Sequence, residues 1–314
     1  MAKPLGGAEP PIRAAALYLI YGHYSIILRG MMSGKLKMPS RRGGVDGVSH
    51  YAKIYSYPGG LVDIVASSSP DFKEVGWEPA DEWSKGSKPK PSEAQRKSPD
   101  PKGEDLQRSM RRARAKVRRL ALANEFRWFV TLTLDPEKVD SKDGAAVVKV
   151  LNAWCSNAVQ RYGLRYILVP ERHKKGGIHF HGFFSDSLEA VDSGTMKPPG
   201  GGKPRKPRSA AQRADWLRNG GQVVYNLPRW TWGFTTAMEL YGEYPAAVAY
   251  VCKYIGKEGE KPSGRWYYSG GDLREPEVTY AEISPAQLVE EFGEKAYLLY
   301  PPGKQIAVVN GVKG

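Results

Sequence analysis

The segment GGIHFHGFF, residues 176–184, constrains the fold more than any other stretch of the chain. Its apolar residues alternate with histidines, which is typical of a strand with one apolar and one polar face. Side chains alternate across a strand, so His179 and His181 lie on one face and the intervening Phe180 lies on the other. The apolar face can pack on a core and leave both imidazoles in a cleft, where they are candidate metal ligands. The alternative is a strand with two structural histidines.

The preceding segment VPERHKKGGIH, residues 169–179, predicts a hairpin that decides whether a third ligand joins the histidines. If the loop holds three residues, Glu171 falls opposite one of the two histidines on the same face. A two-residue loop at Lys175–Gly176 would turn Glu171 to the wrong side. His173 has the same parity as Glu171 and is a weaker substitute ligand. Two imidazoles and one carboxylate leave open positions for water and a phosphate oxygen, as a catalytic metal requires.

A second informative segment is AAVAYVCKYIGKE, residues 246–258, which has helical periodicity. One stripe is apolar, formed by Val248, Val251, Cys252 and Ile255. The opposite side carries Tyr250 and Tyr254, one turn apart, and each is followed three residues later by a lysine, Lys253 or Lys257. A phenol can attack a phosphodiester and form a covalent intermediate if nearby positive charge neutralises the phosphate. The alternative is an amphipathic helix whose outer face happens to carry these residues.

The charge of the chain favours a polyanionic partner. Among 314 residues, 47 Lys and Arg stand against 33 Asp and Glu, a net charge of +14 that favours nucleic acid over a membrane surface. The segment at residues 104–126 predicts a helix with one apolar stripe and a basic face that carries Arg111, Arg112 and Arg118. Such a face can follow phosphates, or it can simply be solvated.

Composition divides the chain into parts. Residues 1–83 contain short β-like runs between 14 and 66 and predict a small β-rich appendage of unassigned role. Residues 84–105 predict a flexible linker, since Ser84–Gly103 has no apolar residue larger than alanine. The main domain is expected at 106–300, with a basic, glycine- and proline-rich insertion at 185–221 and a tail at 301–314. Within it we expect strands at 126–136 and 165–171 and a helix at 145–162.

Some classes of protein are disfavoured by the sequence. Two distant cysteines argue against a disulfide framework or a cysteine-ligated zinc site and fit a reducing cytoplasm. The apolar run at 14–28 is too short to span a bilayer, and no targeting segment is recognised. The GGGK segment at 200–203 is followed by proline rather than Ser or Thr, so no P-loop and no ATPase engine are predicted.

Three motifs together resemble the HUH single-strand endonucleases, and among them the rolling-circle replication initiators of plasmids and small phages. FVTLTL (129–134) is similar to the first motif, GGIHFHGF (176–183) to the metal-binding second, and YVCKYIGK (250–257) to the third in its two-tyrosine form. The tyrosines follow the histidines, as in replication initiators, whereas conjugative relaxases have the reverse order. The resemblance covers about residues 106–273.

This resemblance implies an α+β fold with a central antiparallel sheet of about five strands and flanking helices, related to the RNA-recognition and polymerase palm folds. It implies Mg²⁺ or Mn²⁺ at His179 and His181, with Glu171 as the upstream acid. Tyr250 or Tyr254 would attack single-stranded origin DNA, leaving a 5′-phosphotyrosine and a free 3′-hydroxyl.

The resemblance also implies partners and a place of action. Lys253 and Lys257 are expected to stabilise charge, and no general base is assigned. A host helicase and DNA polymerase are expected partners, in the cytoplasm of a bacterial host, with no membrane involved. The origin sequence, the oligomeric state and the order in which the tyrosines act stay open.

The segment GRWYYSGGDL, residues 264–273, follows the tyrosines and carries Arg265 beside three aromatic residues. These side chains could grip or stack on a single strand. Equally, the segment could be a strand and turn packed on the sheet. Two alternatives to the nicking enzyme are a non-catalytic nucleic-acid binder on a similar sheet and a two-tyrosine transposase.

Overall fold

The computed structural model describes residues 51–68, 103–240, 244–257, 259–300 and 305–313. The chain forms two compact units, one from residues 1–87 with 277–314 and the other from residues 88–276. Two predicted regions lie outside the described residues: the β-like run within 14–28, and residues 84–102 of the expected linker. No helix of the described residues has the length and apolarity needed to cross a membrane.

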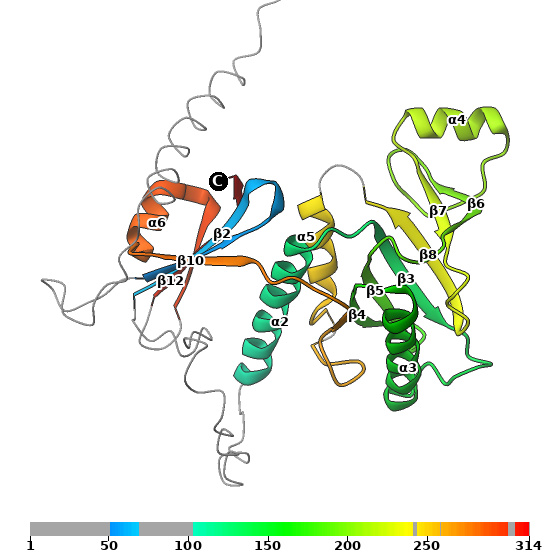
Figure 1. The fold of residues 1–314 in the computed structure, drawn as a ribbon, viewed down its shortest axis with the longest axis horizontal. Coiled ribbons are helices and arrows are strands. Elements are labelled where there is room, and N and C mark those ends of the chain that lie inside the picture. The colour runs from blue at the N-terminus through cyan, green and yellow to red at the C-terminus, as the bar shows by residue number, and fades with distance from the viewer. Residues whose placement is uncertain (1–50, 69–102, 241–243, 258, 301–304, 314) are drawn as a thin grey trace, which may run out of the picture. The chain divides into compact units, whose positions relative to one another are not determined.

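The second unit is built on an antiparallel sheet in the order β6-β7-β8-β3-β5-β4-β9 (Figure 1). The strands are β3 (Trp128–Leu134), β4 (Tyr166–Arg172), β5 (Ile178–Phe184), β6 (Val191–Lys197), β7 (Gln222–Asn226), β8 (Gly233–Glu239) and β9 (Tyr268–Gly270). The expected α+β class and antiparallel sheet are confirmed. The sheet has seven strands rather than about five, because it is extended at both edges, by β6 at one edge and β9 at the other.

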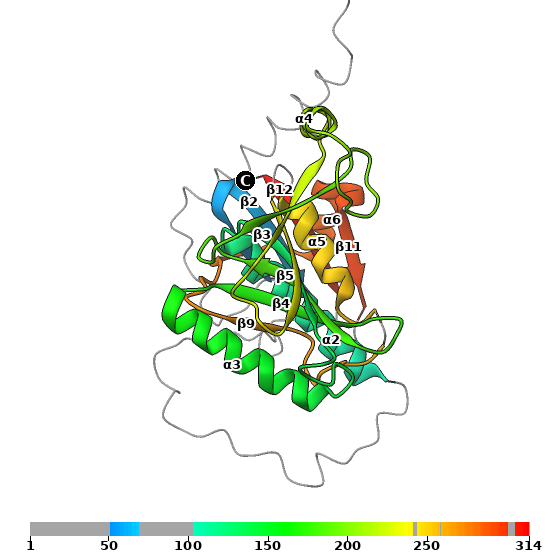
Figure 2. The ribbon, with the colours of Figure 1, turned by 90° about the vertical axis from the view of Figure 1, so that its right-hand side faces the viewer.

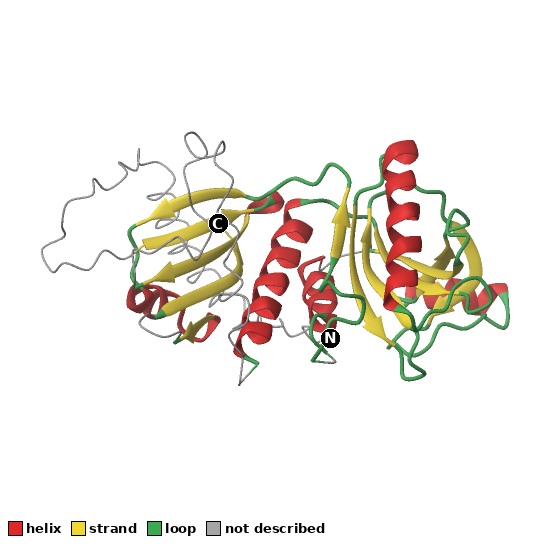
Figure 3. Ribbon diagram, turned by 90° about the horizontal axis from the view of Figure 1, so that it is seen from below, coloured by secondary structure: helices red, strands yellow, loops and turns green. Residues whose placement is uncertain are grey.

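Helices cover both faces of this sheet. They are α2 (Glu104–Ala123), α3 (Gly144–Tyr162) and α5 (Tyr244–Tyr254), whereas α4 (Ala210–Arg218) lies at one edge of the sheet, beside β7. In Figure 3 α3 lies on one side of the sheet, and α2 and α5 lie on the other. The two long segments expected to be helical therefore form helices, and α3 starts where the Asp143 side chain accepts a hydrogen bond from the Ala145 amide.

Alternation along β3 assigns a different role to each face of the sheet. Val130 and Leu132 are fully buried toward α3, in a core shared with Leu151 of that helix. Burying such a side chain contributes roughly 1.5–3 kcal/mol. The intervening Thr131 and Thr133 face the other side and are only half-buried. One face of the sheet is thus a packed core, while the other is free to present polar groups.

Helix α2 supports α5 through packing and hydrogen bonds. The apolar stripe expected on α2 is buried at Ala113, Val117 and Leu120. Its Arg114 guanidinium donates two hydrogen bonds, of 3.0 and 2.6 Å, to the carbonyl of Ile255 just after α5. These bonds satisfy a carbonyl that the end of the helix leaves without an intrahelical partner. A residue of the expected DNA-binding face therefore serves a structural purpose.

The first unit is a five-stranded antiparallel sheet in the order β10-β1-β2-β12-β11. Its elements are β1 (Tyr51–Ser56), β2 (Leu61–Ser67), β10 (Glu277–Ala281), α6 (Pro285–Phe292), β11 (Ala296–Leu299) and β12 (Ile306–Lys313). This arrangement corrects the expected domain limits. Residues 277–300 belong to this unit instead of completing a domain at 106–300, since β10 pairs with β1 and β11 pairs with β12. The expected tail at 301–314 contributes β12, which lies between β2 and β11.

The expected insertion at 185–221 has more structure than a loop. Strand β6 pairs with β7 at the edge of the seven-stranded sheet, and the short helix α4 lies between these two strands in the sequence. Figure 2 shows α4 at the far end of this extension, away from α3. The indole of Trp216 on α4 is buried beneath the guanidinium of Arg205, at 5.2 Å. The segment therefore adds strand β6 to the sheet and is not only a loop.

Candidate functional site

Strand register brings the polar residues of three strands together on the face that carries α5. Thr133 of β3 lies opposite His179 of β5, which lies opposite Glu171 of β4. In the next row Thr131 lies opposite His181. Directly opposed residues of antiparallel strands share a face, so the two histidines and the carboxylate point to the same side.

The β4–β5 hairpin has the three-residue loop that this arrangement requires. The His173 amide donates to the Gly177 carbonyl at 2.7 Å, which leaves residues 174–176 as the loop. Gly176 has φ of 90°, a conformation that favours glycine at the end of such a loop. The register places Glu171 on the histidine face, as expected for the longer of the two possible loops. The His173 ring stacks on that of His179 at 5.1 Å.

Helix α5 presents both tyrosines to the histidines. The Tyr254 ring stacks on the His181 ring, with centroids 4.2 Å apart and planes 10° apart. The Tyr254 hydroxyl donates a hydrogen bond to the Tyr250 hydroxyl at 2.7 Å, and the Tyr250 ring packs edge-on against Phe129. Val248 and Val251 are buried on the reverse side, as the apolar stripe predicts. Residues far apart in sequence thus form one cluster.

The end of α5 directs a lysine back toward the sheet. Gly256, with φ of 77°, follows the helix and turns the chain. Lys257 then reaches Glu171, to which its ammonium group donates a hydrogen bond. Lys253 is on the last turn of α5 and is exposed. We refer to Glu171, His179, His181, Tyr250, Tyr254 and Lys257 as the His–Tyr cluster.

Two threonines of β3 contact the histidines from behind. The Thr131 Oγ1 lies 3.1 Å from His181 Nδ1, and the Thr133 Oγ1 lies 3.4 Å from His179 Nδ1. In each imidazole the Nδ1 atom is therefore engaged within the sheet, which leaves Nε2 for other partners. The sequence reasoning did not assign these threonines a role, although their spacing of two residues matches that of the histidines.

The electrostatics of the cluster keep its groups in definite protonation states. Burial lowers the pKa of His181, although neighbouring Glu171 acts in the opposite direction, and burial together with His173 lowers the pKa of His179. Burial alone would raise the pKa of Glu171, but the hydrogen bonds and charges of Lys257 and His181 together outweigh burial and hold the pKa below its usual value. Neutral imidazoles and an ionised carboxylate are the forms that bind metals.

Burial also affects the tyrosines. Burial and the hydrogen bond with Tyr250 raise the pKa of Tyr254 well above its usual value. Tyr250 is 49% exposed, whereas Tyr254 is half-buried beneath it. The two phenols therefore differ: the outer one is accessible, and the inner one is a hydrogen-bond donor to it.

The donor set has the chemistry of a divalent-cation site without a preformed cage. Among the residues that the structure describes, no three His, Cys, Asp or Glu side chains are arranged as a ready metal site. Instead His181 Nε2 lies 2.7 Å from one oxygen of Glu171, while Lys257 holds the other oxygen. The two imidazoles, whose Nδ1 atoms are held in the sheet, are ligand types that suit transition-metal cations, and the carboxylate beside them is one that suits Mg²⁺ and Mn²⁺.

The candidate DNA-binding residues make none of the contacts described for the His–Tyr cluster. Arg111 and Arg112 are exposed on α2, and Arg118 is half-buried there. Arg265 is exposed over the Tyr268 ring at 6.0 Å, beside a cavity of about 380 Å³. Trp266 and Tyr268 are 7% and 4% exposed, so these two rings pack in the protein and are not open platforms for bases.

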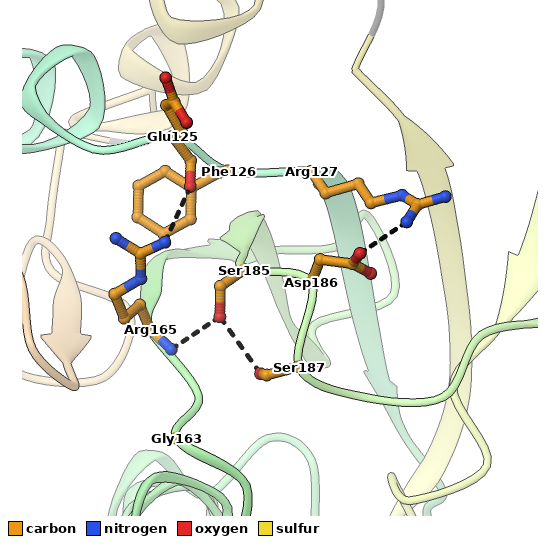
Figure 4. Close-up of a pocket in the computed structure, with 8 residues that line it drawn as sticks. All are labelled: Glu125, Phe126, Arg127, Gly163, Arg165, Ser185, Asp186 and Ser187. Atoms are coloured by element: carbon orange, nitrogen blue, oxygen red, sulfur yellow. Dashed lines mark hydrogen bonds and ion pairs between the residues drawn. The ribbon is translucent and has the colours of Figure 1, made fainter. Parts of the chain in front are cut away.

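A second cavity, of about 430 Å³, lies at the other end of the strands (Figure 4). Its polar side chains mostly bond one another. Arg127 donates to Asp186 at 2.6 Å, and the Ser185 hydroxyl accepts from the Arg165 amide at 3.0 Å. The length of β3 separates its rim at Arg127 from Thr133, roughly 20 Å. This cavity is separate from the His–Tyr cluster.

The fold and the cluster define an α+β domain whose antiparallel sheet presents histidine, glutamate and lysine to a pair of tyrosines. Residues 127–259 match a family model described as a replication-associated protein of the ORF2 type. The matched segment contains every residue of the His–Tyr cluster and supports a replication-initiator family. No curated protein and no solved structure gives a match to the chain.

Proposed function

We propose that this protein is a replication initiator of the two-tyrosine HUH type, which nicks single-stranded origin DNA and rejoins strands during rolling-circle replication. The observation that supports this most directly is the stacking of Tyr254 on His181 at 4.2 Å, with the Tyr250 hydroxyl bonded to that of Tyr254. A nucleophile for phosphate and two candidate metal ligands thus meet within one small site.

In the proposed reaction the Tyr250 oxygen attacks the phosphorus of the scissile linkage. The bond from phosphorus to the 3′-oxygen breaks, giving a 5′-phosphotyrosine and a free 3′-hydroxyl that primes synthesis. Tyr250 is the first nucleophile because it is exposed and accepts a hydrogen bond from Tyr254, which stabilises negative charge on its oxygen. Tyr254 then attacks the phosphorus of the regenerated junction and releases a new 3′-hydroxyl. This hydroxyl attacks the Tyr250 phosphotyrosine, which frees the Tyr250 phenol and joins the strand, so the phosphodiester energy is conserved.

The chain's own residues hold the metal site and balance its charge. His179, His181 and Glu171 would hold Mg²⁺ or Mn²⁺, which when bound supplies Lewis-acid polarisation of the scissile phosphate. Thr131 and Thr133 orient the imidazoles, and Lys257 and His181 together hold the pKa of Glu171 below its usual value. Lys253, exposed on the last turn of α5, would neutralise charge on the phosphate.

The deciding experiment is a search for the covalent adduct. Full-length protein is incubated with Mn²⁺ and single strands that tile the replicon encoding it, and mass spectrometry of DNA-linked peptides identifies the tyrosine. We expect an adduct at Tyr250 in the wild type, none in Tyr250→Phe, and an adduct without strand transfer in Tyr254→Phe. Tyr162→Phe on α3 serves as the matched control. Full activity of both single variants would show that the tyrosines are interchangeable.

The same experiment also tests two other functions. If no strand of the replicon forms an adduct while binding persists, the protein is a non-catalytic nucleic-acid binder. Transfer between strands that flank a mobile element, rather than at an origin, would make it a transposase. For the initiator, we propose that host helicase and polymerase act with it in the bacterial cytoplasm. Replication of relaxed duplex by the purified protein and polymerase alone would contradict that partnership.

A further inference from the structure

One aromatic side chain on the sheet is mostly exposed. Phe234, near the start of β8, is 71% exposed. In the described part of the second unit no other large apolar side chain is as exposed. The flanking residue Thr235 is buried, and its hydroxyl accepts a hydrogen bond from the Leu227 amide at 2.7 Å. The strand is therefore held in place by its other face, and the Phe234 ring is free to meet a ligand.

Register places this ring on the face of the His–Tyr cluster. Phe234 lies opposite Thr133 of β3, which lies opposite His179 of β5. These three residues and Glu171 thus form one row across four strands, all pointing to the same side. Two strand spacings separate Phe234 from His179, roughly 10 Å. A strand of DNA whose phosphate lies at the histidines can reach the ring with a neighbouring nucleotide.

The surroundings of Phe234 favour a base over a protein partner. Its neighbours on this face are the exposed Thr236, the half-buried Thr133 and the half-buried His179. A protein-docking surface would present a continuous apolar patch, whereas Phe234 is one exposed apolar ring with threonines and an imidazole as its neighbours in this row. A flat ring of this kind suits an unpaired base, which stacks through its π-face while its polar edges stay in contact with water and hydroxyl groups.

We propose that Phe234 is a stacking platform for an unpaired base next to the scissile phosphate. The proposal rests on the proposed function, because it takes single-stranded DNA to be the ligand of this face. Stacking tolerates any base, so Phe234 would position the strand without reading its sequence. It would also select against duplex, whose bases are already stacked on one another.

Binding without cleavage tests the platform. The full chain carrying Tyr250→Phe and Tyr254→Phe is titrated, without metal, into a fluorescein-labelled oligothymidylate, and anisotropy gives the dissociation constant. We expect Phe234→Leu to weaken binding about tenfold and Phe234→Trp to restore it, since leucine is apolar but cannot stack. Tyr162→Leu, which removes an exposed aromatic ring from α3, is the matched control and should leave binding unchanged.

Two results would overturn the platform. Equal affinity of the chains with and without Phe234→Leu, both folded by circular dichroism, would mean that the ring contacts no base. An equal loss of affinity for the matching duplex would mean that it acts on the backbone. Photocrosslinking of a 5-iododeoxyuridine strand should label the peptide that contains residues 233–239. The outcome is separate from the nicking proposal, because a stacking effect without any Mn²⁺-dependent adduct would leave Phe234 as the platform of a non-catalytic binder.

Discussion

Thr131 is the residue that orients His181, since its hydroxyl lies 3.1 Å from Nδ1. Replacing it with valine keeps the shape and the strand preference but removes the hydroxyl. We expect Thr131→Val to lower Mn²⁺ affinity about tenfold, because outer partners of metal-binding histidines typically contribute that much. Titration calorimetry with Mn²⁺ measures the affinity directly.

Conservative variants separate this role from folding. Thr131→Ser retains the hydroxyl and should restore Mn²⁺ affinity. Thr236→Val, on the neighbouring strand directly opposite Thr131, removes a hydroxyl that points to the same face and should change nothing. If Thr131→Val binds Mn²⁺ as tightly as the wild type, the hydroxyl does not position the ligand.

Lys257 is expected to speed adduct formation in two ways. It pairs with Glu171, and its positive charge offsets the negative charge of the phosphate. Lys257→Met retains most of the side-chain bulk but leaves the carboxylate without its cation. We expect the rate of adduct formation in a single turnover to fall about 10²-fold. Lys149→Met, at an exposed position of α3, is the control for the general loss of one positive charge. Similar rates for both variants would show that Lys257 has no specific role.

The residues of the site differ in how far the sequence could predict them. Local alternation was enough to place His179 and His181 on one face. The sequence allowed two lengths for the hairpin loop, so the face that carries Glu171 stayed undecided. Thr131 and Phe234 could not be assigned in this way. Their roles depend on the pairing of β3 with β5 and β8, and no local pattern specifies the register of strands so far apart in sequence.

At the level of elements, Gly256 allows α2 and the end of α5 to approach closely. A Cβ at this position would lie 1.9 Å from Met110 Sδ, and φ of 77° is strained for any other residue. We expect Gly256→Ala to lower the free energy of unfolding by roughly 1–3 kcal/mol, measured by chemical denaturation of the full chain. Adding Met110→Ala should restore the part of the unfolding free energy that is lost to steric overlap, whereas the part lost to backbone strain should remain lost. No recovery would mean that strain alone is responsible.

The thiol of Cys252 reports on the same packing. It faces α2, 3.7 Å from the Arg114 carbonyl, and burial raises its pKa to about 11. At pH 8 about one such thiol in a thousand is ionised, and it is shielded as well. We expect it to react with a thiol reagent only after unfolding, and Gly256→Ala to speed that reaction, which peptide mapping would locate. Rapid labelling of the native wild type would mean that α2 and α5 separate readily.

Helices and central strands were predictable because their periodicity is local. The stripe of α2, the strand at β3 and the apolar side of α5 all appear as predicted from the sequence. The aromatic segment after α5 was ambiguous. Trp266 is buried and donates a hydrogen bond to Ser109 of α2 at 2.9 Å, a partner 157 positions away that composition alone cannot indicate.

At the scale of the whole molecule, the two units should be separable. Residues 103–276 contain every strand of the seven-stranded sheet and the whole His–Tyr cluster. We expect this fragment to unfold cooperatively and to form the same DNA adduct as the full chain, as measured by denaturation and denaturing gels. A fragment with residues 1–276 should aggregate instead, because it exposes the edges of β1 and β2. A soluble, monodisperse 1–276 fragment would argue against the assigned pairing.

The division of the chain was the least predictable feature. Composition suggested a break near residue 84 but nothing near 276, since the break there separates one strand-rich segment from another. Strand β12 pairs with β2 across more than two hundred residues. Contacts of such sequence separation leave no local signature, and only the observed topology reveals them.

The position of β12 between β2 and β11 sets an order of events during synthesis. The sheet of the first unit cannot close until the ribosome has made Ile306–Lys313, whereas all segments of the second unit have by then emerged. The hairpin made first must therefore wait for its partner, and the second unit matures ahead of the sheet whose segments flank it in the gene.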